Sequence, residues 1–413
     1  MLPLIIPIGA LLLGVALLLL GNGLLNTLLA LRGSIEGYDD SLMGLIMSGY
    51  FVGFFMGTFA AMPLINRIGH IRAFAFCAAL TSCMSLLHVL FVNPYVWMLL
   101  RVMTGALLVT LYTVIESWLT AQTTKELRGR VFAIYMVVNL GALTIAQQLL
   151  RLDTSFSFVL FALAAMLISV SLAPVTITRL AQPIISNAPR LKFKTIYALA
   201  PIAVIGSALS GLAMGGFWGM AAIYANHAGL DVAGVATFIS CAILGGALFQ
   251  YPMGRYSDKH DRRKVLAVIT LFASFAAILL AVLSHYGAWI LFAVAIYGGL
   301  TFTVYPVIVA HLADHLEPEN MLSGVSGLLL LYGIGAALGP ALAGQLMHVF
   351  GYQALPFYFF IMQFLSAIYA LKKYREHGAE SVQHASPFVP MVRTSPTALN
   401  MMTEEQIPTS ESK

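Results

Sequence analysis

The sequence predicts an all-α membrane protein of twelve transmembrane helices arranged as two six-helix pseudo-repeats. Three observations lead to this fold class: the composition, the series of apolar segments, and a loop sequence that occurs twice. Of the 413 residues, 60% are hydrophobic and only 9% are charged, whereas a soluble globular chain has about 25% charged residues. Twelve membrane-crossing helices of about 20 residues each would use nearly all of these hydrophobic residues. The composition therefore excludes a soluble multidomain enzyme.

Twelve apolar segments follow one another, separated by charged or Gly/Pro-rich breaks. They cover residues 4–31, 42–65, 73–92, 95–121, 131–150, 156–177, 196–224, 233–253, 265–284, 287–311, 322–349 and 353–371. Each segment is long enough to cross the hydrocarbon core as a helix. The first runs without a charge from Leu2 to Leu31, which is too long for the apolar region of a signal peptide, so we expect it to be retained.

A longer polar connection divides the segments six and six. We expect an N-terminal bundle over residues 1–178, a cytoplasmic linker over 179–195 and a C-terminal bundle over 196–372. Residues 373–413 are rich in Ser, Pro and Glu and have no continuous apolar stripe, which predicts a disordered cytoplasmic tail.

The basic residues gather on one side of the predicted helices. Nineteen of the 22 Lys and Arg residues lie in the tail or in the loops 66–72, 122–130, 178–195 and 254–264. The opposite loops contain two, Arg32 and Arg151. Because basic loops remain in the cytoplasm, we expect a multi-pass protein of the inner membrane with both termini in the cytoplasm. The net charge of +5 then reflects membrane anchoring rather than nucleic-acid binding.

Two loops are diverged copies of one sequence. Residues 62–72 read MPLINRIGHIR, and residues 254–264, which follow 192 positions later, read GRYSDKHDRRK. The same spacing relates Gly141 to Gly333. Repeats of this kind are typical of transporters, in which a site near the membrane midplane opens to each side as one half rocks against the other.

Several motifs resemble the major facilitator superfamily over residues 1–372. The most specific is the loop Gly254-x-x-x-Asp258-Lys259-x-x-Arg262-Arg263, with Asp261 where the family usually has Gly. In the first copy, Met62 and Asn66 replace the Gly and the Asp. Arg101-x-x-x-Gly105 is similar to the family's fourth-span arginine motif.

The eleventh segment contains Gly335-x-x-x-Gly339-Pro340-x-x-x-Gly344, similar to the family's Gly-Pro motif. Antiporters of the family carry that motif in the fifth span, where this chain has Gly141 to Gln148 without a proline. Shorter stretches resemble an uncharacterised bacterial branch labelled YcaD-like: LNTL at 25–28, VIES at 114–117, RGR at 128–130, YP at 305–306 and LM at 346–347. The resemblance implies a fold and a topology but no substrate.

Arg101 and Glu116 are the two carboxylate or guanidinium residues inside the predicted helices. Each costs about 2–3 kcal/mol at a helix centre, so a functional role is the default hypothesis. They share a face of the fourth helix but stand about 22 Å apart along its axis, too far to pair. We predict that Glu116 carries a coupling proton; the alternative is a neutral carboxyl bonded to a neighbouring helix. Arg101 either holds an anionic substrate or proton-linked partner, or donates to backbone carbonyls.

Other polar and aromatic side chains are predicted to line a central cavity formed by the first, fourth, seventh and tenth segments. The predicted substrate-binding residues are Arg101, Tyr112, Asn22, Asn26, Asn139, Trp218, Tyr297 and Tyr305. The alternatives are interhelical hydrogen bonds for the amides and core packing for the aromatic rings.

A conformational latch is predicted at the repeated loop, since Asp258 can accept from arginines or from a helix N-terminus in one conformer. Its predicted members are Asp258, Lys259, Arg262 and Arg263, with Asn66 and Arg67 in the first copy. Membrane anchoring explains the arginines equally well but leaves Asp258 unexplained.

We predict a secondary transporter rather than an enzyme, because the chain has no phosphate-binding loop, Cys-x-x-Cys or nucleophile elbow. No cofactor or metal is expected. The apolar, aromatic cavity favours proton-coupled export of an amphipathic or lipophilic small molecule. Proton-coupled uptake of a small organic solute is the second hypothesis. A non-transporting receptor or assembly partner is the third, with the tail as its interaction module. Expected partners are the substrate, protons and the bilayer, for a monomer that binds no nucleic acid.

Overall fold

The computed structural model describes residues 2–124, 127–177, 193–377 and Phe388. Helices make up nearly all of this described chain, and no strand occurs in it. The helices are α1 (Leu2–Ile35), α2 (Asp40–Ile68), α3 (His70–Leu90), α4 (Pro94–Gln122), α5 (Arg128–Gln148), the 3-10 turn η2 (Leu149–Leu152), α6 (Phe158–Val170), α7 (Leu172–Ile177), α8 (Phe193–Leu199), α9 (Pro201–His227), α10 (Val232–Ser257), α11 (Arg262–Leu283), α12 (Trp289–Ala313), α13 (Pro318–Phe350) and α14 (Ala354–His377).

Twelve helical segments of the described chain are long and apolar enough to cross a membrane, which confirms the predicted series. The sixth consists of α6 and α7 in succession. The seventh begins at Pro201 rather than at residue 196, and the short helix α8 precedes it. Proline is favoured in the first turn of a helix, where its missing N–H has no partner to lose. Most of the predicted linker and tail lies outside the described residues.

The outer faces of the helices are apolar, as a bilayer requires. Val137 on α5 is 71% exposed, Leu248 on α10 is 72% exposed and Phe272 on α11 is 58% exposed. In water such a surface would favour aggregation, whereas in lipid it is solvated. The chain is therefore a multi-pass membrane protein.

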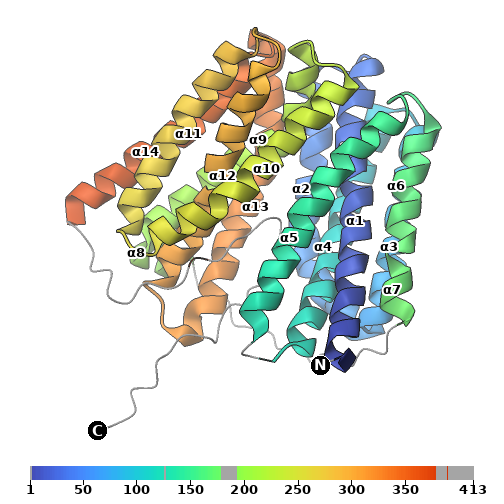
Figure 1. Ribbon diagram of the computed structural model, residues 1–413, viewed down its shortest axis with the longest axis horizontal. Helices are drawn as coiled ribbons and strands as arrows, with labels where there is room; N and C mark the ends of the chain where they lie inside the picture. The colour runs from blue at the N-terminus through green and yellow to red at the C-terminus, as the bar shows by residue number, and fades with distance from the viewer. Residues whose placement is uncertain (1, 125–126, 178–192, 378–387, 389–413) are drawn as a thin grey trace.

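The helices of the two halves of the chain lie side by side, α1 to α7 on one side and α8 to α14 on the other (Figure 1). Across the boundary α2 packs against α13, α5 against α10 and α1 against α9. We name the two ends of the bundle by their connections. The α1–α2 end holds the turn at 36–39, and the α10–α11 end holds the loop at 258–261.

Glycines bring α2 and α4 into backbone contact. A Cβ atom on Gly53 would collide with the carbonyl oxygen of Val102, and one on Gly105 would collide with that of Tyr50. Close approach of this kind is how helices associate in lipid, where the hydrophobic effect gives no driving force between them. This contact positions the aromatic residues of α2 directly over α4.

Candidate functional site

A cavity of about 1020 Å³, part of it open to solvent, lies between α2, α9, α12 and α13. It extends from the middle of these helices toward the α10–α11 end. Its walls are formed by Tyr50, Phe51, Phe54, Phe55, Thr58, Met214, Trp218, Thr301, Phe302, Tyr305, Ser326, Leu329, Leu330, Tyr332, Gly333 and Ala336. The volume suits a drug-sized organic molecule.

The cavity wall is aromatic and uncharged. Eight of its residues carry aromatic rings, and none is Asp, Glu, Lys, Arg or His. Tyr305 and Tyr332 pack with their ring centroids 4.6 Å apart, and Trp218 packs against Phe302 at 5.8 Å. A few hydroxyl groups supply the polar contacts, including those of Thr58, Thr301 and Ser326. Such a surface binds flat or amphipathic molecules through their apolar area.

Contacts between the two halves close the α1–α2 end. His227 Nε2 at the end of α9 lies 3.0 Å from Asp40 Oδ1 at the start of α2. One turn along α2, Gly44 packs against the backbone of Pro340 and Gly344 on α13. The Ser41 hydroxyl donates to Gln345 Oε1 at 2.6 Å.

A second layer of contacts lies deeper on the same side. The Ser48 hydroxyl of α2 accepts a hydrogen bond from the Ala341 N–H of α13 at 3.0 Å. Where α5 packs on α10, Gln148 Nε2 of α5 donates to the Ser240 hydroxyl of α10 at 2.7 Å. These bonds sit between the cavity and the α1–α2 end, so the cavity is closed in that direction.

Arg101 links three helices at the inner limit of this closed region. Its side chain is fully buried, and its guanidinium lies 4.7 Å from the Tyr50 ring centroid. Its Nη2 donates to Asn26 Oδ1 of α1 at 2.7 Å. The Asn26 Nδ2 in turn donates to the backbone carbonyl of Trp218 on α9 at 3.0 Å. Asn26 thus bonds to α4 in its own half and to α9 in the other.

Glu116 lies in a second buried polar group on α4. Its side chain is fully buried, and the Tyr135 hydroxyl of α5 donates to its Oε1 at 2.8 Å. Asn139, one turn further along α5, donates to the Tyr135 carbonyl at 2.9 Å. A hydroxyl donor serves a carboxylate or the unprotonated oxygen of a carboxylic acid, so this arrangement tolerates either protonation state of Glu116.

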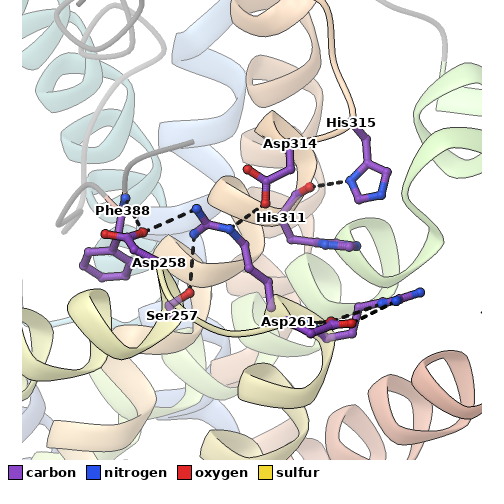
Figure 2. Close-up of polar contacts among 9 residues, drawn as sticks. Ser257, Asp258, Asp261, His311, Asp314, His315 and Phe388 are labelled. Atoms are coloured by element: carbon purple, nitrogen blue, oxygen red, sulfur yellow. Dashed lines mark hydrogen bonds and ion pairs between the residues drawn. The ribbon is translucent and has the colours of Figure 1, made fainter. Parts of the chain in front are cut away.

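The loop between α10 and α11 forms an ionic cluster at the opposite end of the bundle (Figure 2). Arg262 Nε lies 2.6 Å from Asp314 Oδ2 at the end of α12, and its Nη2 lies 3.4 Å from Asp258 Oδ1. The backbone N–H of Phe388 also donates to Asp258 Oδ1, at 2.9 Å, and its ring packs on Gly254. The pKa of Asp258 is raised above its usual value, chiefly by partial burial, although the Arg262 guanidinium and the Phe388 N–H oppose this rise.

Asp261 has a local structural role in this cluster. It is the N-cap of α11, where its Oδ1 accepts from the Arg263 N–H at 2.9 Å. Its Oδ2 lies 2.9 Å from Arg263 Nη2. Lys259 is exposed, and so are Asn66 and Arg67 at the corresponding end of α2. The polar contacts found for the predicted latch therefore lie in its second copy.

Comparison with known protein families identifies the fold. The model of the Major Facilitator Superfamily matches residues 11–200 and 203–402. The chain belongs to the major facilitator superfamily. It is a secondary transporter with the twelve-helix architecture of that superfamily, and not an enzyme.

Curated relatives with similar sequences are also facilitator-type proteins. The uncharacterized MFS-type transporter YcaD of Escherichia coli O9:H4 (strain HS) is 29% identical over 378 residues, which cover 90% of this chain and 96% of the relative. The uncharacterized MFS-type transporter Ent638_1421 of Enterobacter sp. (strain 638) is 28% identical over 383 residues, covering 92% and 98%. These relatives confirm the resemblance to the YcaD-like branch.

Solved structures with the same fold include the nucleoside transporter NupG, with a TM-score of 0.73, 13% identity, and coverage of 89% of this chain and 99% of NupG. A bacterial homolog of the human lysosomal transporter Spinster, in an inward-facing and occupied conformation, has a TM-score of 0.68 and 16% identity, with coverage of 88% and 94%. At these identities the likeness shows the fold alone.

Two of the four segments that the sequence predicts to form the cavity line it, and α2 and α13 form the rest of its wall. Segments seven and ten contribute as expected, with Trp218 and Tyr305 in the wall, but α1 and α4 do not contribute to it. The aromatic residues of α2 stand between α4 and the cavity: Tyr50 covers Arg101, and the Phe54 ring lies 6.2 Å from the ring of Tyr112.

The remaining predicted binding residues are buried away from this wall. They are Arg101, Tyr112, Asn22, Asn26, Asn139 and Tyr297. Tyr297 stacks on Phe359 of α14 with the centroids 4.9 Å apart, which is the core-packing alternative. Asn22 has no hydrogen-bond partner for either amide atom among the described residues. Within that part of the chain, no three His, Cys, Asp or Glu side chains are close enough to hold a metal ion.

The α2 wall was missed by sequence reasoning. Tyr50, Phe54 and Thr58 recur every four residues, and so do Gly49, Gly53 and Gly57, which is the signal that would have found it. On a helix these two sets form adjacent stripes. The glycine stripe packs on α4, which leaves the aromatic stripe to face inward.

Proposed function

We propose that this facilitator works by alternating access and that the structure is its inward-facing conformer, in the inner membrane with both termini in the cytoplasm. The observation that carries this proposal is the cavity between the halves, closed at the α1–α2 end by Ser48–Ala341, Gln148–Ser240 and Asp40–His227. The excess of Lys and Arg in the loops at the α10–α11 end supports a cytoplasmic location for that end. Opening to the other side requires these bonds to break while the two halves meet at the α10–α11 end.

The proposed substrate is an amphipathic or lipophilic small molecule, and the proposed direction is export. The rings of the wall offer a large apolar contact area, and its few hydroxyls offer only limited hydrogen bonding. A sugar would need many more polar partners, because each buried hydroxyl without one costs free energy. Trp218 and Tyr305 are the predicted binding residues that meet this cavity.

The proposed energy source is the proton gradient, with Glu116 as the proton carrier. A buried carboxyl is stable in its neutral form, and the Tyr135 hydroxyl provides a bond that survives loss of the proton. Glu116 is buried and lies outside the cavity wall in this conformer. In this proposal, its carboxyl exchanges a proton with solvent in the other conformer.

Reconstitution into proteoliposomes with an imposed pH gradient tests the function. Lipophilic cations, weak acids and amino-acid-like solutes are screened for gradient-driven movement. Glu116→Gln is expected to abolish accumulation but to spare exchange of substrate, because only the coupled proton is removed. Glu376→Gln, which changes a carboxylate near the surface end of α14, is the control. Normal accumulation by Glu116→Gln contradicts proton coupling through this residue.

Proton-coupled uptake is the alternative direction, and one observation favours it. Helix α5 lacks the Gly-Pro motif of facilitator antiporters, and its Gln147 and Gln148 bond to Thr27 and Ser240 instead. The same vesicles decide between the two directions. Movement of substrate toward the more acidic compartment indicates exchange against protons, and movement with the protons indicates uptake.

A further inference from the structure

The halves meet in the membrane interior through a pair of equivalent residues. Trp218 lies 192 positions after Asn26, the same spacing that separates the two copies of the loop motif. Ser48 and Ser240 are separated by this spacing as well, and each bonds to the opposite half. In an arrangement with two-fold symmetry, equivalent residues can touch each other only close to the symmetry axis. The Asn26–Trp218 contact therefore lies at the pseudo-two-fold axis of the molecule.

The depth of this contact places it between the cavity and the closed end. Asn26 precedes the end of α1 at Ile35 by nine residues, and Trp218 precedes the end of α9 at His227 by nine. At 1.5 Å per residue, both lie about 14 Å below the α1–α2 end. The Trp218 side chain lines the cavity while its carbonyl accepts from Asn26. One residue thus forms both the cavity wall and the innermost bond of the closure.

Arg101 fixes the direction in which the Asn26 amide points. A guanidinium only donates hydrogen bonds, so the amide oxygen must face Arg101 Nη2, as the distance of 2.7 Å shows. The amide nitrogen then faces the Trp218 carbonyl at 3.0 Å. If the amide were reversed, its nitrogen would face the Arg101 guanidinium, donor against donor, and its oxygen would face the Trp218 carbonyl, acceptor against acceptor. The buried arginine therefore orients a donor of the N-terminal half toward an acceptor of the C-terminal half.

We infer that Asn26 is a positioning residue for the conformational change: its bond to the Trp218 carbonyl stabilises the conformer closed at the α1–α2 end, with Arg101 holding Asn26 in place. This inference rests on the alternating-access function proposed above. It assigns Asn26 and Arg101 a role in the equilibrium between conformers instead of contact with substrate.

The test measures the distance across the α1–α2 end without substrate. Spin labels at Leu152 and Tyr286, both more than 60% exposed, report this distance in a cysteine-free background reconstituted in lipid. Asn26→Leu removes both bonds without adding a charge. Asn26→Asp keeps an acceptor for Arg101 but turns an acceptor toward the Trp218 carbonyl. Both variants are expected to raise the ratio of open to closed molecules about tenfold, the effect of losing one buried hydrogen bond.

Asn22→Leu is the matched control, since Asn22 lies one turn earlier on α1 and is also buried. Its ratio should remain within twofold of the unmodified protein. A wild-type ratio in Asn26→Asp overturns the inference, because that variant lacks the donor yet retains a partner for Arg101. An equal shift in Asn22→Leu also overturns it, because the effect is then general to α1. Transport plays no part in this readout, so a failure of the proposed function appears separately, in the vesicle assay.

Discussion

At the residue scale, the polar groups of this protein fall into separate clusters with different partners. Arg101 and Glu116 share one helix, yet Arg101 bonds to Asn26 and Glu116 to Tyr135. At the α10–α11 end, Arg262 lies between Asp258 and Asp314. Each buried charge has a hydrogen-bonding partner, which is the condition for keeping it out of water. Substitution of a single partner should therefore affect one cluster at a time.

Asp258→Asn tests the latch at that scale. The amide retains an acceptor for Phe388 and Arg262 but loses the charge that pairs with Arg262. The pair is partly exposed, and such pairs contribute about 0.2–1 kcal/mol, so we expect transport to fall about two- to fivefold with normal membrane insertion. Initial rates in vesicles, normalised to inserted protein, measure this. The control is Asp153→Asn at the other end. Unchanged transport in Asp258→Asn would contradict the proposal that Asp258 acts as a conformational latch.

The sequence alone singles out one residue of each cluster but not all of the residues that it contacts. Rarity in an apolar helix is enough to single out Arg101 and Glu116, and the loop motif singles out Asp258. Asp314 and Phe388 were missed because they are 52 and 130 residues distant from the residues they contact. A long-range partner has no periodic signature in a single sequence.

At the element scale, packing decides which helices form the cavity. The sequence predicts all twelve membrane-crossing segments, because hydrophobic length is a local property. The choice between α2 and α4 as the wall is decided by the packing of one helix on the other. It depends on Gly53 and Gly105, which allow α2 to lie against α4 and cover it with Tyr50 and Phe54.

Gly53→Ala should weaken this contact. The added methyl group meets the Val102 carbonyl oxygen, and overpacking of this kind costs about 1–3 kcal/mol. A lower midpoint of thermal unfolding in detergent measures the effect. Gly141→Ala on α5 is the matched control, since no atom lies within 4 Å of the added group. Alanine favours helix over glycine by about 1 kcal/mol, so the control should be unchanged or slightly stabilised. Equal midpoints for both variants would contradict the packing role.

At the scale of the whole molecule, the two halves form a pseudo-symmetric pair, and the cavity described above lies between them. Their contacts are gathered at the α1–α2 end, and the cavity occupies the space toward the α10–α11 end. Beyond α14 the structure describes Phe388, which packs against the hydrophobic core and contacts Gly254 and Asp258.

Truncation after Lys373 separates a transporter from a receptor or assembly partner that signals through its tail. The Phe388 N–H bond is partly exposed, and a bond of this kind contributes about 0.5–1.5 kcal/mol. We expect the truncated protein to retain transport within a fewfold of the full chain in the vesicle assay. Complete loss of transport with normal insertion would favour the tail as the functional module.

Alternating access is tested most directly by distances across both ends of the same molecule. Labels at Leu152 and Tyr286 report the α1–α2 end, and labels at the exposed residues Ile177 and Lys372 report the α10–α11 end. When substrate and a pH gradient are applied in lipid, we expect the first distance to lengthen in the molecules that turn over while the second shortens. Two distances that stay fixed, or that lengthen together, would contradict a rocking movement of the two halves.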